Sequence, residues 1–88
     1  MATRIEKKVW PEMMAPILSG KKRFDIRLDE FQVSPGDTLV LKEWDPKKKA
    51  YTGRSLEKKV TFVMKTKELP FWNTEEAASK GFIVMSIE

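Results

Sequence analysis

The sequence predicts a single small domain of mainly β (α+β) class, a β-barrel of about five strands with one short helix after the first strand. Three observations lead to this fold class. The chain is 88 residues long and has neither a repeat nor a low-complexity linker, so residues 1–88 fit one domain. Short apolar segments alternate with turn signals rich in Pro, Gly and Asp. Five strands in so short a chain are too few for two packed sheets, whereas closure into a barrel removes exposed strand edges.

The first strand candidate covers residues 4–9, where apolar and charged positions alternate. The alternation is imperfect because Lys7 falls on the apolar face. Trp10-Pro11 then predicts the start of a helix, since proline suits the first helical turn. Four apolar residues at helical spacing predict the stripe that closes one end of the barrel, namely Met13, Met14, Ile17 and Leu18.

The helix is expected to end at Gly20, because glycine takes the left-handed backbone conformation of a C-cap without strain. Residues 22–27 then predict the second strand. Phe24 and Ile26 fall on one face of that strand, and we assign that face to the core. The opposite face is one charged row, formed by Arg23, Asp25 and Arg27.

Two strands joined by an exposed turn follow in the middle of the chain. A strong turn signal at residues 34–37 precedes the clearest strand, residues 38–44. A lysine-rich turn beginning at Asp45 is expected to end near Gly53. Residues 55–66 form the longest strand candidate, whose apolar face should carry Leu56, Val60, Phe62 and Met64.

A bulge or a solvent-exposed end near Glu57 and Lys58 would explain why a lysine interrupts that face. Residues 67–81 are expected to be irregular, with a short helix capped by Asn73 or Thr74. Residues 82–87 form the final strand and are apolar enough to be central. The barrel core is therefore predicted to contain Phe24, Ile26, Leu39, Leu41, Val60, Phe62, Ile83 and Met85.

The composition excludes several classes of site. The chain has no cysteine and no histidine, which rules out disulfides, thiolate metal sites, a cysteine nucleophile and a Ser-His-Asp triad within it. We expect neither a metal nor a cofactor. The chain has no apolar run of the roughly 20 residues needed to span a bilayer. Its N-terminal residues also lack the apolar core of a secretory signal, so we expect a cytoplasmic protein without membrane association.

The charge distribution favours a polyanionic partner. The formal net charge is +4, and residues 1–67 carry 16 Lys and Arg against 9 Asp and Glu. A basic body attracts nucleic acid through phosphate contacts and counterion release. The same lysines are also compatible with an ordinary solvated surface.

The segment from Ile17 to Arg27 resembles the signature of the ASCH family, which runs Gly-x-Lys, two residues, an acidic residue, one residue and Arg. Gly20, Lys22, Asp25 and Arg27 occupy these four places. The resemblance covers most of residues 5–88 and looks like one branch of small stand-alone ASCH-like domains. It continues in Pro35-Gly36-Asp37, in Glu43-Trp44-Asp45 and in Tyr51-Thr52-Gly53-Arg54.

The resemblance implies a PUA-like β-barrel with a cleft at the helix-to-strand junction, proposed in such domains to bind RNA or nucleotide-like ligands. Lys22 and Arg27 would bind a phosphate or a base edge there, and Asp25 would accept from a base amino group. We therefore predict that the chain is an RNA- or nucleotide-binding module. The complete set of predicted ligand-binding residues is Lys21, Lys22, Arg23, Asp25, Arg27, Trp44, Tyr51 and Arg54.

Two alternatives stay open at this point. Some ASCH relatives are amidohydrolases that remove an acyl group from an acylated cytidine nucleoside with a Lys, a Thr nucleophile and a later Glu. Lys22 falls on that Lys, but the Thr position falls on Asp25, so we lean against catalysis. The second alternative is a protein-interaction domain of phage or mobile-element origin, whose face would be the acidic segment 68–76 with Phe71 and Trp72.

Overall fold

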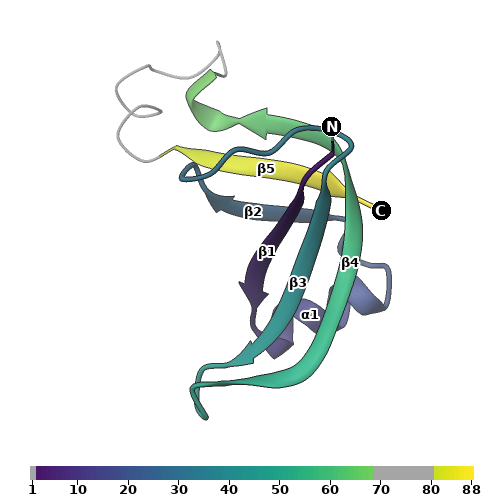
Figure 1. Cartoon of the computed structure of the whole chain (residues 1–88), viewed down its shortest axis with the longest axis vertical. Coiled ribbons are helices and arrows are strands. Elements are labelled where there is room, and N and C mark those ends of the chain that lie inside the picture. The colour runs from purple at the N-terminus through teal and green to yellow at the C-terminus, as the bar shows by residue number, and fades with distance from the viewer. Residues whose placement is uncertain (1, 69–80) are drawn as a thin grey trace.

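Five strands form one mixed sheet in the order β1-β3-β4-β5-β2 in the computed structural model, which describes residues 2–68 and 81–88 (Figure 1). β1 pairs with β3 in parallel, and the other three pairings are antiparallel. The α-helix α1 follows β1 in the chain. The elements are β1 (Arg4–Val9), α1 (Pro11–Leu18), β2 (Phe24–Leu28), β3 (Thr38–Asp45), β4 (Ala50–Lys65), the short 3-10 helix η1 (Thr66–Glu68) and β5 (Phe82–Ile87).

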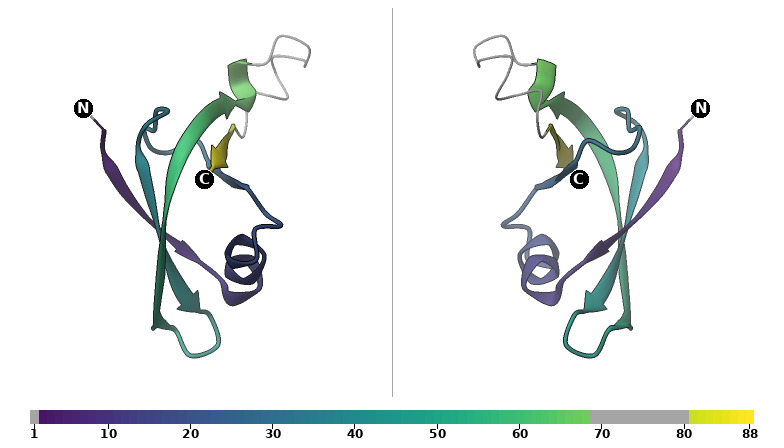
Figure 2. Two further views of the ribbon diagram at one scale, coloured as in Figure 1. Left: turned by 90° about the vertical axis from the view of Figure 1, so that its right-hand side faces the viewer. Right: turned by 90° about the vertical axis from the view of Figure 1, so that its left-hand side faces the viewer.

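The long strand β4 joins two differently oriented halves of the sheet. Its first part, through Lys59, pairs with β3, and its second part, from Val60, pairs with β5. Figure 2 shows the resulting bend, with α1 on the concave side. The concave side holds the buried core, whose members among the described residues are Val9, Met14, Ile17, Val33, Leu39, Leu41, Val60, Ile83, Met85 and Ile87.

The five strands and the helix after the first strand agree with the sequence prediction, but the structure does not confirm the closed barrel. Strands β1 and β2 stand at the two ends of the sheet, and no pairing joins them within the described residues. β1 has the predicted bounds, as does β5. None of the helices in residues 2–68 and 81–88 is long and apolar enough to cross a membrane.

The predicted orientation of β2 is wrong. Phe24 and Ile26 are exposed, whereas Asp25 is only 3% exposed and faces the core. The cause is the register with β5, because Asp25 lies opposite the fully buried Met85 and Arg27 shares its side of the strand. Alternation by two residues identifies two faces of a strand, but it does not say which face turns inward.

The predicted apolar face of β4 is also partly wrong. The register with β5 shifts between Val60 and Phe62, so one extra residue sits in the strand and the side chains beyond it change face. Phe62 and Met64 are exposed in consequence, and Val63 packs against the core in their place. The bulge thus occurs after Val60 and not near Glu57 and Lys58, where the sequence had offered a bulge as one of two explanations.

The turn after β3 is shorter than predicted. Asp45 pairs with Ala50, so β4 has already begun before Gly53. Gly53 instead lies inside β4. It stands opposite the part of β3 between Lys42 and Trp44, where the register of the two strands shifts. Its φ of +96° is a left-handed value that a side chain would strain, and it allows the irregularity in the ladder.

The helix α1 begins at Pro11, as predicted. Only part of its predicted stripe is buried, because eight residues present a narrow face to the sheet. Met14 and Ile17 are buried, whereas Met13 and Leu18 are about half exposed. The predicted helix capped by Asn73 or Thr74, like Phe71 and Trp72, lies outside the described residues.

Candidate functional site

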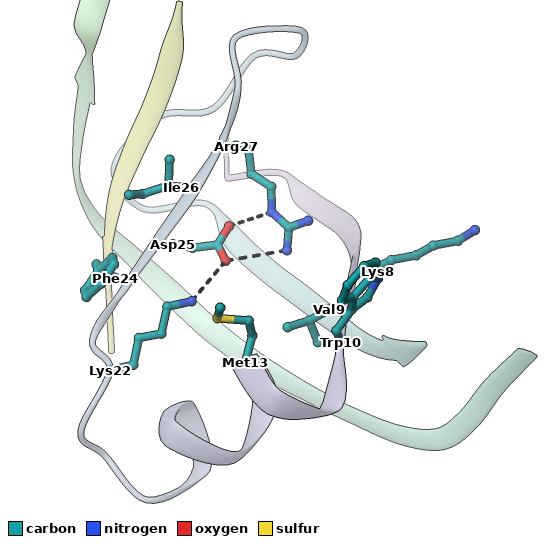
Figure 3. Close-up of a pocket in the computed structure, with 9 residues that line it drawn as sticks. All are labelled: Lys8, Val9, Trp10, Met13, Lys22, Phe24, Asp25, Ile26 and Arg27. Carbon is teal, nitrogen blue, oxygen red and sulfur yellow. Dashed lines mark hydrogen bonds and ion pairs between the residues drawn. The ribbon is translucent and has the colours of Figure 1, made fainter. Parts of the chain in front are cut away.

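A pocket of about 520 Å³ opens beside the end of β1, between α1 and the near part of β2 (Figure 3). Its lining is mostly apolar, but three charged side chains from one short segment reach into it. These are Lys22, Asp25 and Arg27. The apolar lining comes from Val9, Trp10, Met13, Phe24 and Ile26, with Lys8 at the rim.

Asp25 is the centre of this charged group. Arg27 donates from Nε to Asp25 Oδ2 at 2.7 Å, and its Nη2 lies 3.5 Å from Oδ1. Lys22 Nζ stands 3.9 Å from the same Oδ1. The Asp25 side chain is 4% exposed, and a buried carboxylate of this kind requires such partners.

The turn between α1 and β2 places Lys22 at the pocket. Gly20 ends the helix with a φ of +81°, the predicted left-handed cap. The Lys22 amide then donates to the Pro16 carbonyl at 3.0 Å, which folds the chain back against the helix end. The amide of Ile87 donates to the Arg23 carbonyl at 3.0 Å and joins this segment to β5.

The group carries one more positive charge than negative. Lys22 and Arg27 face a single carboxylate, and the 3.9 Å contact of Lys22 is a loose ion pair and not a hydrogen bond. Arg27 has five N–H donors, and two of its nitrogens point to Asp25. No other described residue accepts a hydrogen bond from these two side chains, so their remaining donors can serve an anionic or acceptor-rich ligand in the pocket.

A second pocket of about 410 Å³ adjoins the first along the gap between β1 and β2. The two pockets share Ile26 and Arg27. Lys7 lines the second pocket and places its Nζ 3.8 Å from the centre of the Phe31 ring, which also lines it. The gap between the edge strands β1 and β2, which do not pair with each other in the described residues, is thus bordered by cations and aromatic rings.

Lys21 and Arg23, also predicted as ligand-binding residues, do not line the first pocket. Lys21 is exposed. Arg23 is exposed as well and donates from Nε to the Gly20 carbonyl at 3.3 Å, across the turn. The structure therefore brings together Lys22, Asp25 and Arg27 from the predicted charged segment and leaves the other two cations outside.

The aromatic residues predicted to stack on a ligand lie elsewhere. Trp44 and Tyr51 form an edge-to-face pair with ring centroids 5.0 Å apart, at the β3–β4 hairpin. Lys8 Nζ stands 3.9 Å from the Trp44 ring centre, a cation–π contact. Neither ring lines the first pocket, so this pair would need a separate ligand contact.

Arg54 is held by Glu43, a buried residue that the site prediction had missed. Glu43 accepts from Arg54 Nε at 3.0 Å and from Thr52 Oγ1 at 2.7 Å. These hydrogen bonds, chiefly that of Arg54, hold the pKa of the Glu43 carboxyl below its usual value. The sequence did contain a signal for this contact. The two motif segments Glu43-Trp44-Asp45 and Tyr51-Thr52-Gly53-Arg54 hold all three residues that form it.

Trp10 and Met13 also line the pocket and were not among the predicted site residues. Both are about half exposed. Met13 lies on the outer side of the short helix α1, and Trp10 is the N-cap residue that precedes it. As for metals, no group of three acidic side chains in residues 2–68 and 81–88 is placed to hold an ion.

Comparison with known proteins adds a family and a fold. A family model described as "Domain of unknown function (DUF3850)" matches residues 6–87. The crystal structure of a hypothetical protein, PH0355, superposes with a TM-score of 0.65 at 22% sequence identity, over 97% of each chain. At that identity the likeness concerns the fold alone. None of the curated proteins matches this chain.

Proposed function

We propose that this chain, which belongs to the DUF3850 family, is a nucleic-acid-binding module that holds RNA or a nucleotide at Lys22 and Arg27. The observation that carries the proposal is the convergence of these two cations on one mostly apolar pocket around Asp25. A phosphate would take the unused donors of the cations. A base would lie against the apolar lining.

The anchoring by Asp25 supports this function because it fixes the cations in place. A guanidinium already held at Nε loses little further freedom when a phosphate binds its remaining donors. Trp10 offers a half-exposed ring on the same pocket, and base–aromatic stacking suits single-stranded ligands. The net charge of +4 supports attraction of a polyanion over a longer range.

We also propose that the chain belongs with the ASCH and PUA-like domains. Gly20, Lys22, Asp25 and Arg27 fit that signature, and they stand at a helix-to-strand junction beside a pocket. The PUA-like barrel is part of this proposal. It rests on the strong bend of the sheet, which brings the edge strands β1 and β2 to the two sides of the same pockets.

Fluorescence anisotropy with a short labelled single-stranded RNA tests the proposal. Affinity should fall steeply between about 50 and about 200 mM salt, since phosphate contacts release counterions. The variant Lys22→Gln with Arg27→Gln should bind at least about ten times more weakly and should lower the log–log salt slope by about 1.4, the contribution of two phosphates on a single strand.

A matched control removes two other charges. Lys47 and Lys48 lie exposed in the β3–β4 turn, and Lys47→Gln with Lys48→Gln makes the same change in net charge. The control should lose less than about threefold in affinity. Equal losses in both variants, or an affinity that is flat with salt, would contradict a site at the pocket.

The hydrolase alternative stays a prediction. The residue at the position of the relatives' Thr nucleophile is Asp25, whose carboxylate is engaged by Arg27 and Lys22. Incubation with acylated cytidine, with Lys22→Gln as the control, would reveal activity through loss of the acyl group. The interaction face at residues 68–76 lies almost entirely outside the described residues, and a cytoplasmic location also stays a prediction.

A further inference from the structure

The outward face of β2, β5 and the second part of β4 is apolar across all three strands. Six of its side chains have exposed fractions between 36% and 59%. The register sets them side by side, since Ile26 and Met64 both lie opposite Val84, and Leu28 lies opposite Phe82. We call this surface the apolar face; its exposed members are Phe24, Ile26, Leu28, Phe62, Met64 and Phe82.

The outward face of the other half of the sheet is charged and suited to contact with solvent. On the outward side of β1, β3 and the first part of β4, Arg4 pairs with Glu57 at 2.7 Å and Lys42 pairs with Glu6 at 3.2 Å. Antiparallel strands with one solvated side normally carry polar residues there. The apolar face carries none of these charges at the outward positions of its described strands, where the polar residues are Ser86 and Thr61, whose hydroxyl donates to the Ser86 carbonyl.

The apolar face is large enough to support a stable contact. With roughly 150–250 Å² for each large side chain, its exposed fractions amount to about 500 Å² of apolar surface. A standard interface buries about 800 Å² on each partner, and the rim of polar atoms would supply the remainder. The largest apolar patch on a typical monomer, about 300–600 Å², is often functional, and two copies of this face would together bury about 1,000 Å², the lower limit of a biological interface.

We propose that the apolar face binds a second copy of this chain, sheet against sheet, around a two-fold axis near β5. Because the face lacks charge, its copy meets it without repulsion, which a two-fold contact of a patch with itself requires. Paired sheets pack at about 10 Å, and the three Phe rings would interdigitate there. Nucleic acid fits this face poorly, since the outward positions of its strands hold no cation for a phosphate and Lys22 approaches it only at Phe24, 5.3 Å from that ring centre.

The dimer contact does not depend on the proposed function, but it borders the candidate site. Phe24 and Ile26 belong to the apolar face and also line the pocket. Phe62 and Met64 lie on β4 and line none of the described pockets that form the site. Substitution at Phe62 therefore tests the dimer without altering Lys22 or Arg27.

Sedimentation equilibrium of the full chain is the first measurement. The wild-type protein should approach twice the 10.2 kDa of one chain at about 100 μM, with a dissociation constant in the micromolar range. Phe62→Lys should weaken the dimer at least about a hundredfold and leave a monomer, since it places like charges in the contact. Leu18→Lys is the matched control, because Leu18 is equally an exposed apolar residue but lies on α1.

Far-UV circular dichroism and a thermal melt establish that each variant is folded. A wild-type protein that stays monomeric at about 100 μM overturns the proposal, whether or not it binds RNA and whatever other partner the face has. A folded Phe62→Lys variant that remains a dimer overturns it too. A folded monomer at Phe62→Lys together with a dimer at Leu18→Lys supports it.

Discussion

The Arg27 guanidinium donates to the Asp25 carboxylate at 2.7 Å, between two residues that share the inward face of β2. Two charged side chains on the core side of a small sheet are costly to desolvate, so each depends on the other. Lys22 joins them from the preceding turn at 3.9 Å. The pair therefore bears on the stability of the fold as well as on the candidate site.

Loss of the Asp25–Arg27 pair should destabilise the fold. Arg27→Leu leaves a buried carboxylate without its shortest contact and should cost about 2 kcal/mol, less than the 3–5 kcal/mol of fully buried pairs because Arg27 is partly exposed. Asp25→Leu with Arg27→Leu should recover part of that loss. Urea unfolding measures both, and a double variant less stable than Arg27→Leu would contradict the pairing.

The buried stripe of α1 can be tested with two neighbouring methionines. Met14 is buried and Met13 is about half exposed. Met14→Ala should lower the free energy of unfolding by about 2–5 kcal/mol, since it leaves a cavity in the core. Met13→Ala should change it by less than about 1 kcal/mol. Equal effects of the two substitutions would mean that the helix is rotated relative to the sheet.

Asp37 should make stability depend on pH. Its carboxylate accepts from the Thr3 and Ser34 amides at 2.9 Å each, and these bonds hold its pKa below the ordinary 3.8. A pKa lower in the folded state means that the stabilisation is present above about pH 3.8 and is lost as pH falls through the folded value. Glu43 acts in the same direction, because hydrogen bonds from Arg54 and Thr52 lower its pKa.

Thermal melts between acid and neutral pH measure this dependence. Asp37→Asn should lower the melting temperature at neutral pH and flatten its fall in acid. The control Glu30→Gln changes an exposed carboxylate and should leave the profile as it is in the wild type. A wild-type melting temperature that rises as the pH falls would reverse the predicted sign.

We expect the main effect of Arg54 to be on the stability of the β3–β4 hairpin and not on ligand binding. Its guanidinium donates from Nε and Nη2 to the two oxygens of Glu43, a two-point contact that lysine cannot reproduce. Arg54→Lys should therefore lower the melting temperature while RNA affinity stays within about twofold of the wild type. A loss of RNA affinity without a loss of stability would instead mean that Arg54 contacts the ligand.

The element bounds followed from local signals in the sequence. β1, β5 and the start of α1 occur where alternation, a proline and turn residues predicted them. Gly20 adopts the left-handed φ that its place after a helix required. The cluster of Lys22, Asp25 and Arg27 could be named in advance because all three fall within six consecutive residues of one signature.

The inward face of each strand could not be read from the sequence in this way. On β2, the alternation predicted Phe24 and Ile26 as the core face, but Asp25, which pairs with Met85, is the residue that faces inward. On β4, one extra residue after Val60 exchanged the inward and outward positions of the side chains that follow it in the strand. A slip of one residue exchanges the two faces of a strand, and only partners far away in the chain select the register.

The sequence by itself determined the order of the described strands and α1, the bounds of β1 and β5, and which charged segment gathers at the helix-to-strand junction. Those features depend on neighbours within a few residues, whose backbone preferences act locally. Only the tertiary structure decided that Asp25 is buried between Lys22 and Arg27 and that Phe24 and Phe62 are left on an outward apolar face. These outcomes depend on strand register, which the packing of the whole sheet sets.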